Sequence, residues 1–136
     1  MDDVLRLTIV RGLPGSGKSK FANSLKGVVT VDDDSFFETD DGYKFKEEYY
    51  KDSFKYIQAM AMYHLFRGKS VVVTSPFIKV KDITPFKGIA KRYNAIFEIV
   101  EVKGNYGSTH GVPVAVMQDM RDNWEVYPPK KKVRKK

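Results

Sequence analysis

The residue types and spacing between positions 12 and 19 suit the binding of phosphate. This segment is Gly-Leu-Pro-Gly-Ser-Gly-Lys-Ser, which contains the pattern Gly-x-x-x-x-Gly-Lys-Ser. Glycines let a backbone curve around an anion with its N–H groups pointing inward, and the N-terminus of a following helix adds partial positive charge. We therefore expect the segment to bind the phosphates of ATP, or of a related nucleoside triphosphate, together with Mg²⁺.

Individual positions of this loop have distinct expected roles. Lys18 is expected to reach the β and γ phosphates and to stabilise the transferring charge, and the hydroxyl of Ser19 is expected to bind Mg²⁺. The alternative is a glycine-rich turn followed by a surface lysine. The predicted nucleotide-binding residues are Gly12, Pro14, Gly15, Ser16, Gly17, Lys18, Ser19 and Lys20.

Elements that could position the loop are predicted on both sides of it. Residues 4–10 form a short run rich in branched apolar residues, which indicates a buried strand, and residues 19–26 are expected to form a helix that ends at Gly27. A second strand, residues 28–31, leads directly into three consecutive carboxylates, Asp32-Asp33-Asp34.

Strands and helices are predicted to alternate along the rest of the chain. This alternation predicts an α/β fold with a parallel sheet of about four to five strands and helices on both faces. Pro85 is expected in the first turn of its helix. The predicted elements are a loop over 38–46 with a turn at Asp40-Asp41-Gly42, helices over 47–66, 82–93 and 113–124, strands over 71–73 and 95–102, and a loop over 103–112.

Length and composition suggest one compact domain with a basic tail. The chain has 136 residues and no cysteine, which excludes disulfides and thiolate metal sites and favours a reducing compartment. We expect a domain over 1–127, a disordered tail over 128–136 and a cytoplasmic location, because no apolar run approaches the length of a bilayer.

The net charge of +7 comes mainly from this tail, because 18 of the 24 basic residues lie elsewhere and nearly balance the 17 acidic ones. The folded body is therefore not expected to bind nucleic acid through its overall charge. The tail is similar to a nuclear-localisation signal and to a nonspecific polyanion-binding arm. We favour contact with nucleic acid, and a plain solubilising tail is the alternative.

Short motifs spread over residues 5–125 resemble those of a known family. They are Gly12–Ser19, Asp34-Ser35-Phe36-Phe37, Asp41-Gly42 with Tyr43 and Phe45, Val72–Phe77, Ile89–Tyr93, His110-Gly111-Val112-Pro113, Met117, Met120-Arg121 and Trp124-Glu125. Together they resemble the polynucleotide-kinase-like P-loop kinases, which include the 5′-hydroxyl kinase domain of phage polynucleotide kinase and small AAA-like ATPases. The resemblance implies a three-layer P-loop NTPase fold and phosphoryl transfer from ATP to a hydroxyl.

The resemblance also implies roles for acidic residues after the second strand. The match to Asp-x-Phe-Phe assigns the general base to Asp34, which is also expected near Mg²⁺. Counting from the end of the strand favours Asp32 instead. A solvated turn is the alternative for all three carboxylates, although crowded carboxylates are costly unless Mg²⁺ or a lysine offsets them.

The chain departs from the family where the third strand ends and near His110. Thr74 stands where active members carry aspartate, and its hydroxyl is expected to hold a Mg²⁺-bound water. Residues 103–112 contain no arginine to stabilise the transferring phosphoryl group, so Arg121 or Lys103 is expected to replace it.

Three functions remain open from the sequence. The first is an ATP-dependent kinase acting on a hydroxyl of a nucleotide or polynucleotide. The others are a nucleotide-binding module without transfer activity, with a regulatory or host-interaction role, and an enzyme similar to nucleoside-monophosphate kinases.

Overall fold

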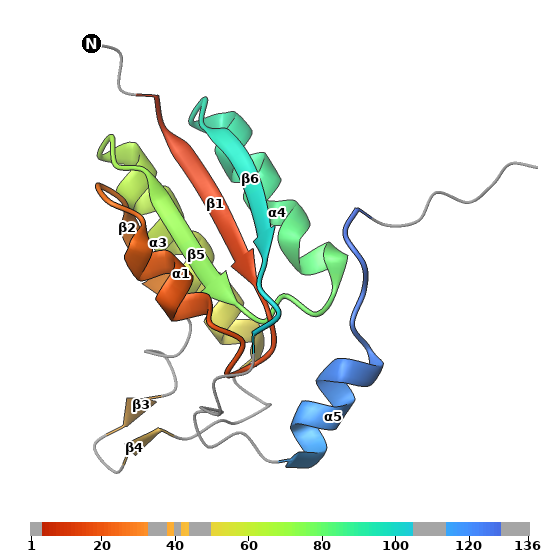
Figure 1. Ribbon diagram of the computed structural model, residues 1–136. Helices are drawn as coiled ribbons and strands as arrows, with labels where there is room; N and C mark the ends of the chain where they lie inside the picture. Colours follow the sequence, from red (N-terminus) through yellow and green to blue (C-terminus); the bar gives the residue numbers. More distant parts are fainter. Residues whose placement is uncertain (1–3, 33–37, 40–41, 44–49, 105–113, 129–136) are drawn as a thin grey trace, which may run out of the picture.

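The centre of the molecule is a four-stranded parallel sheet. The structure, a computed structural model, describes residues 4–32, 38–39, 42–43, 50–104 and 114–128. The sheet has the order β2-β5-β1-β6, so the strand before the phosphate loop lies inside it (Figure 1). Its strands are β1 (Arg6–Arg11), β2 (Val29–Asp32), β5 (Val71–Ser75) and β6 (Ile96–Glu101).

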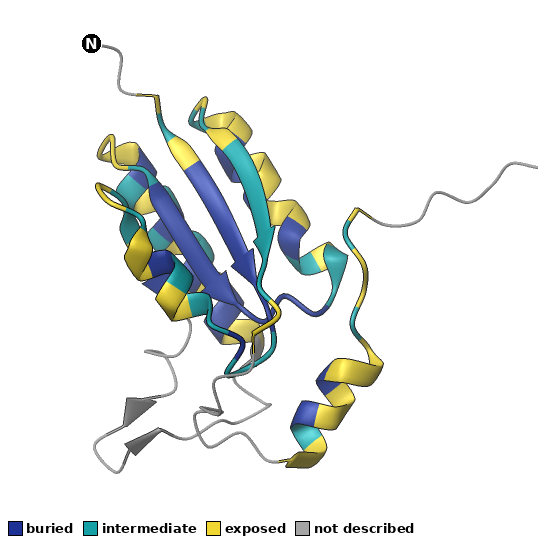
Figure 2. Ribbon diagram, viewed as in Figure 1, coloured by how far each residue is buried: buried dark blue, intermediate teal, exposed yellow. Residues whose placement is uncertain are grey.

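The two inner strands, β1 and β5, are buried except for Arg6 at the start of β1, as Figure 2 shows. The run Val71-Val72-Val73 is apolar without alternation, which is typical of a parallel strand covered on both faces. Strand β6 is an edge strand whose residues are only partly buried or exposed. The predicted α/β class, with about four to five parallel strands, is therefore confirmed.

Helices cover both faces of this sheet. Helix α1 (Lys18–Ser24) packs against one face, where Ala22 contacts a small cluster around Val10 and Val72. Helices α3 (Tyr50–Phe66) and α4 (Val80–Arg92) pack against the other face and form the larger core (Figure 1). Residues on alternate positions of each strand therefore face different helices.

Helix α4 starts two residues earlier than predicted. Its first residue is Val80, so Pro85 lies inside the helix, and the prediction that this proline stands in the first turn is wrong. The reason is a distant contact, since the Val80 N–H donates to Glu125 Oε1 at 2.7 Å. That carboxylate satisfies an N–H that has no partner inside the helix, as a local capping residue would.

Two short segments complete the described chain. Strands β3 (Glu38–Thr39) and β4 (Gly42–Tyr43) pair in an antiparallel hairpin, so the prediction of a plain loop is wrong there. Helix α5 (Val114–Asp122) follows β6 in the chain. No helix in the described part of the chain is both long and apolar enough to span a membrane. Residues 129–136 of the predicted tail over 128–136 lie outside the described residues.

Candidate phosphate-binding site

The phosphate loop connects the inner strand β1 to helix α1. A turn forms within it, because the Ser16 N–H donates to the Leu13 carbonyl at 3.0 Å. Gly15 and Gly17 have φ values of 80° and 102°, which side-chain-bearing residues rarely adopt. Gly17 then caps α1 in this left-handed conformation. The glycine pattern therefore serves the strand–loop–helix geometry for which it was expected.

Gly12 is required for a different reason, namely lack of space. A Cβ atom at this position would lie 2.8 Å from both Cγ2 and the backbone oxygen of Val102, and closer still to Ser16 Oγ. The end of β6 approaches here because the Val102 N–H donates to the Arg11 carbonyl at 2.9 Å. The loop is therefore built against the segment that follows β6.

Lys18 lies back over the loop that precedes it. Its Nζ donates to the Gly12 carbonyl at 2.8 Å and to the Leu13 carbonyl at 3.1 Å. These contacts hold the ammonium group against the loop and not out in solvent. Ser19 and Lys20 follow on the first turn of α1 and are exposed, so both are accessible to a ligand.

A row of residues crosses the sheet beside this loop. Asp32 pairs in register with Thr74, and Thr74 pairs with Val10, so the three lie at one level of the sheet. Neighbours in register point to the same face, which here is the α1 face, because Val10 packs there with Ala22. The carboxylate and the hydroxyl therefore project side by side, near the end of the strand that enters the loop.

The hydroxyl of Thr74 has no hydrogen-bond partner within the described residues, although Thr74 is only 1% exposed. An unpaired buried hydroxyl costs free energy unless a ligand or water completes it. Thr74 and Asp32 lie side by side, and Ser19 is exposed on the first turn of α1, so these residues supply oxygen atoms of the type that Mg²⁺ prefers. The residues present therefore fit a magnesium-bound triphosphate.

Of the other expected site residues, the structure describes some and not others. Asp33, Asp34 and His110 lie outside the described residues, so the choice between Asp34 and Asp32 as the base stays a prediction. Arg121 is exposed on α5 and lines a pocket that also touches the phosphate loop at Leu13 and Ser16.

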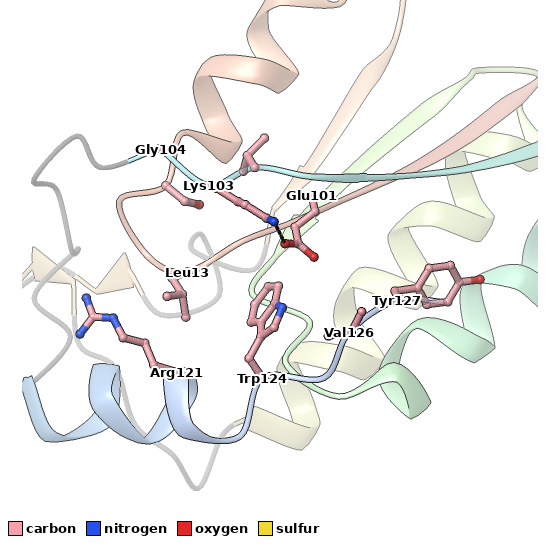
Figure 3. Close-up of a pocket in the computed structure, with 10 residues that line it drawn as sticks. Leu13, Glu101, Lys103, Gly104, Arg121, Trp124, Val126 and Tyr127 are labelled. Carbon is pink, nitrogen blue, oxygen red and sulfur yellow. Dashed lines mark ion pairs between the residues drawn. The ribbon is translucent and has the colours of Figure 1, made fainter. Parts of the chain in front are cut away.

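This pocket has a volume of about 720 Å³ and lies between the phosphate loop, the end of β6 and the segment after α5. Figure 3 shows the ring of Trp124 beneath the carboxylate of Glu101, with Arg121 on the side of Leu13. Lys103 is exposed, and its Nζ lies 3.4 Å from Glu101 Oε2. The pocket therefore combines an aromatic wall with charges of both signs. Its lining residues are Leu13, Ser16, Glu101, Val102, Lys103, Gly104, Arg121, Trp124, Val126 and Tyr127.

Arg11, which the sequence reasoning did not single out, joins several parts of this site. It is the last residue of β1 and is completely buried. Its guanidinium lies 4.1 Å from the ring centre of Trp124, and its Nη1 lies 3.6 Å from Glu101 Oε1. Burial lowers the pKa of Arg11 from its ordinary value, and the carboxylates of Glu101 and Glu125 oppose that shift. The signal in the sequence is a cation that directly precedes the first loop glycine.

The described residues are better suited to binding phosphate than to binding a metal ion through several charged side chains. No group of three or more His, Cys, Asp or Glu side chains suited to a metal occurs in the part of the chain described. The site instead combines the backbone of the phosphate loop, the ammonium group of Lys18 and the side-chain oxygens of Asp32 and Thr74, all near the carboxyl ends of the strands. This is the place where open parallel sheets bind ligands.

Comparison with solved structures agrees with this fold. A chain in the Pnkp1/Rnl/Hen1 RNA repair complex is 20% identical with a TM-score of 0.60, and the match covers 94% of this chain and 42% of that one. A gluconokinase from Sinorhizobium meliloti is 14% identical with a TM-score of 0.61, covering 92% of this chain and 78% of the gluconokinase chain. The APS kinase CysC from Mycobacterium tuberculosis, a Cys556Ala mutant, is 16% identical with a TM-score of 0.59, covering 90% and 98%.

The chain thus spans less than half the length of the chain in the RNA repair complex, and these identities support the fold alone. Family comparison is more specific, because residues 7–105 match the family described as AAA domain. The matched region includes β1 from Leu7 onward, the phosphate loop, α1 and the other three strands of the parallel sheet. This chain belongs to the AAA domain family and has the P-loop fold that it shares with kinases.

Proposed function

We propose that this protein is an ATP-dependent kinase that transfers the γ-phosphoryl group to a hydroxyl of a nucleic-acid end or a nucleotide-like acceptor. One observation carries the proposal. The phosphate loop lies at the same sheet edge as Asp32 and the unpaired hydroxyl of Thr74. Phosphoryl transfer needs such a combination of an anion-binding loop and oxygen ligands, because it depends mainly on positioning and charge stabilisation.

On the donor side, the loop N–H groups bind the phosphates and Lys18 moves from the loop carbonyls to the phosphate oxygens. The Ser19 hydroxyl and the oxygens of Asp32 and Thr74 hold Mg²⁺ or its bound water. Bound Mg²⁺ supplies positive charge that compensates the phosphate oxygens. Thr74 provides no charge of its own, so Lys18 and Arg121 carry a larger share of the compensation.

On the acceptor side, a carboxylate at the end of β2 or just after it accepts the proton of the attacking hydroxyl. The acceptor oxygen forms a bond to the γ-phosphorus, while the bond from that phosphorus to the β–γ bridging oxygen breaks and ADP leaves. Asp34 holds this role by resemblance to the kinase family. Asp32 is the rival, because it ends β2 in register with Thr74.

The pocket beside the loop is suited to the nucleoside of the donor. Its aromatic wall at Trp124 can stack on a base, and its contact with Leu13 and Ser16 places it beside the phosphates. Arg121 lies on the side of Leu13 in Figure 3, where it can approach the phosphate chain. Chains of similar fold include a gluconokinase, an APS kinase and a chain of an RNA repair complex, which is consistent with a kinase.

A transfer assay tests the proposal directly. The protein is incubated with γ-labelled ATP, Mg²⁺ and separate acceptors: 5′-hydroxyl oligonucleotides, nucleosides, nucleoside monophosphates and small hydroxyl compounds. We expect label on an oligonucleotide or nucleotide-like acceptor. Lys18→Ala should reduce the rate by about 10²–10³-fold, because it removes a donor to the transferring charge. Lys26→Ala, at an exposed position after α1, is the matched control and should leave the rate unchanged.

The base is identified with two further variants in the same assay. Removing a general base typically costs about 10²–10⁴-fold in rate. Asp34→Asn should therefore abolish transfer with ATP affinity changed only a few fold. Loss of transfer only in Asp32→Asn, with the affinity for Mg²⁺–ATP unchanged, would assign the role to the residue beside Thr74, whereas loss of transfer together with weaker Mg²⁺–ATP binding would show that Asp32 holds Mg²⁺. Transfer to nucleoside monophosphates alone would identify the enzyme as similar to nucleoside-monophosphate kinases. No transfer to any acceptor, with ATP binding intact, would contradict the kinase and favour a binding module.

We also propose that the basic tail contributes contact with a nucleic-acid acceptor. Six positive charges lie within residues 130–136. A chain ending at Pro128 should then lose rate with oligonucleotides, most clearly at low salt, and keep its rate with nucleosides. Equal loss with both acceptors would contradict this role.

A further inference from the structure

Arg11 lies in a completely enclosed position between three segments that are distant in sequence. Its Nε and Nη2 donate to the Phe77 carbonyl at 3.1 and 2.7 Å, and Nη2 also donates to the Ile78 carbonyl at 3.3 Å. Glu101 is its neighbour in register on β6. Trp124 covers the guanidinium with its ring. One side chain thus connects the end of β1 with the loop after β5, the end of β6 and the segment after α5.

This arrangement is costly for stability alone. Removing an arginine from water is unfavourable, and a single ion pair rarely compensates the loss of hydration. The loop that it contacts is also strained, because Phe77 has a φ of 50°, which is uncommon for a side-chain-bearing residue. Strained backbone of this kind persists only where surrounding contacts hold it, and it clusters at functional sites.

Two of the residues that Arg11 contacts also line the pocket beside the phosphate loop. Trp124 and Glu101 both line that pocket and both contact Arg11. The next residue, Glu125, binds the start of α4 through the Val80 N–H, and its own N–H donates to the Ile78 carbonyl at 3.0 Å. The guanidinium of Arg11 therefore contacts the Trp124 ring directly. The backbone next to Trp124 is bonded to the loop after β5, which Arg11 also binds.

The phosphates themselves are expected on the opposite side. Arg11 and Val10 are consecutive in β1, so their side chains point to opposite faces, and Val10 faces α1. Asp32 and Thr74 share the level and the face of Val10. The guanidinium of Arg11 therefore lies on the opposite face of the sheet from Asp32 and Thr74, so it contacts the wall of the pocket and not the residues expected near the phosphates.

We propose that Arg11 is a positioning residue, which fixes the Trp124 wall of the pocket and thereby determines how strongly the protein binds the base of its nucleotide. Its effect on the triphosphate is small, because the phosphate loop makes those contacts itself. Since it concerns the base pocket, this role rests on the proposed function. Loss of Arg11 should therefore weaken the binding of nucleotides more than the binding of a triphosphate that carries no nucleoside.

Calorimetry with two probes separates these contributions. Dissociation constants are measured for Mg²⁺–ATP and for Mg²⁺–tripolyphosphate, and their ratio gives the advantage due to the nucleoside. Arg11→Met should lower this advantage by about thirtyfold, the size of a desolvated cation–π contact, and change tripolyphosphate binding by less than about threefold. Arg67→Met is the matched control, because Arg67 also lies over an aromatic ring, that of Tyr63, and is exposed.

A double-mutant cycle tests whether Arg11 acts through Trp124. Trp124→Leu should itself lower the nucleoside advantage, and adding Arg11→Met to it should have little further effect, because coupled residues are not additive. Fully additive effects would contradict the inference. Thermal unfolding of each variant shows whether it is folded at the assay temperature.

Arg11→Lys keeps the test possible if Arg11→Met does not fold. Lysine retains the charge beside Glu101 but lacks the planar fork, so the nucleoside advantage should still fall, by about threefold. An unchanged advantage in a folded Arg11 variant would overturn the inference. Equal losses for ATP and tripolyphosphate would overturn it too, because Arg11 would then act on the phosphate loop. A wild-type protein that binds both probes equally would contradict the proposed base pocket itself.

Discussion

Replacing Gly12 with alanine is expected to damage both stability and ligand binding, and the size of the effect follows from the space around it. The added Cβ would meet three atoms, of which Ser16 Oγ and Val102 Cγ2 can move by side-chain rotation. The backbone oxygen of Val102, 2.8 Å away, cannot, because the Val102 N–H is bonded to the Arg11 carbonyl. The end of β6 or the loop itself must therefore shift.

Overpacking of this type typically costs about 1–3 kcal/mol in the free energy of unfolding. For a domain of this size, that corresponds to a loss of about 3–10 °C in melting temperature. The shift also displaces Gly12 and its carbonyl, which binds Lys18 at 2.8 Å. We therefore expect weaker binding of Mg²⁺–tripolyphosphate, by about tenfold or more, since misplaced contacts cost heavily in such sites.

Gly88→Ala provides the matched control for this substitution. Gly88 lies in α4, nothing surrounds the position of its Cβ within 4 Å, and its φ is not positive. Alanine should stabilise the helix here by up to about 1 kcal/mol without affecting ligand binding. Thermal unfolding and calorimetry are measured for both variants. A Gly12→Ala protein with wild-type melting temperature and wild-type affinity would refute the close approach of β6 to the loop.

Three further predictions concern single residues. Gly68→Ala should destabilise the protein by about 1–2 kcal/mol in chemical denaturation despite open space around its Cβ, because its φ of 78° is unfavourable for alanine; an increase in stability would contradict it. Thr74→Val should stabilise the ligand-free protein by about 1 kcal/mol, because it removes an unpaired buried hydroxyl, and should also slow phosphoryl transfer; a destabilised variant would show that this hydroxyl is bonded. Burial is the main cause that raises the pKa of Asp82, Glu125 adds to it, and Lys81 and Lys79 oppose it. The native state then holds this proton more tightly than the unfolded state, so the wild type loses stability as the pH rises from the ordinary Asp value through the raised one. The difference in melting temperature between Asp82→Asn and wild type should therefore move in favour of the variant from about pH 3 to pH 7, and a difference independent of pH would refute this.

The sequence predicts the local parts of this fold well. The run before Gly12, the glycine spacing and the helix after Lys18 depend on neighbouring residues, so the strand–loop–helix unit is evident from the sequence. The position of Thr74 also follows, because parallel strands end at a common edge. The structure confirms that Thr74 lies near the end of β5, beside Val10.

Contacts between distant residues could not be predicted in the same way. Arg11 is charged, and charged residues are usually exposed, so nothing local indicates its burial against Glu101 and Trp124. The early start of α4 depends on Glu125, which is 45 residues beyond Val80. These contacts arise from how elements pack, and neither periodicity nor capping patterns record them.

The central place of β1 has a consequence for how the protein folds. Arg6, its first residue, forms hydrogen bonds with residues 64 and 92 positions later in the chain, and β1 pairs with β5 on one side and β6 on the other. Closing such long loops is costly before the contacts form, and chains dominated by distant contacts fold slowly. Helices such as α3 can form early, whereas the phosphate loop acquires its shape only after β6 has joined. Recovery of triphosphate binding during refolding should therefore report completion of the sheet, later than helical circular dichroism does.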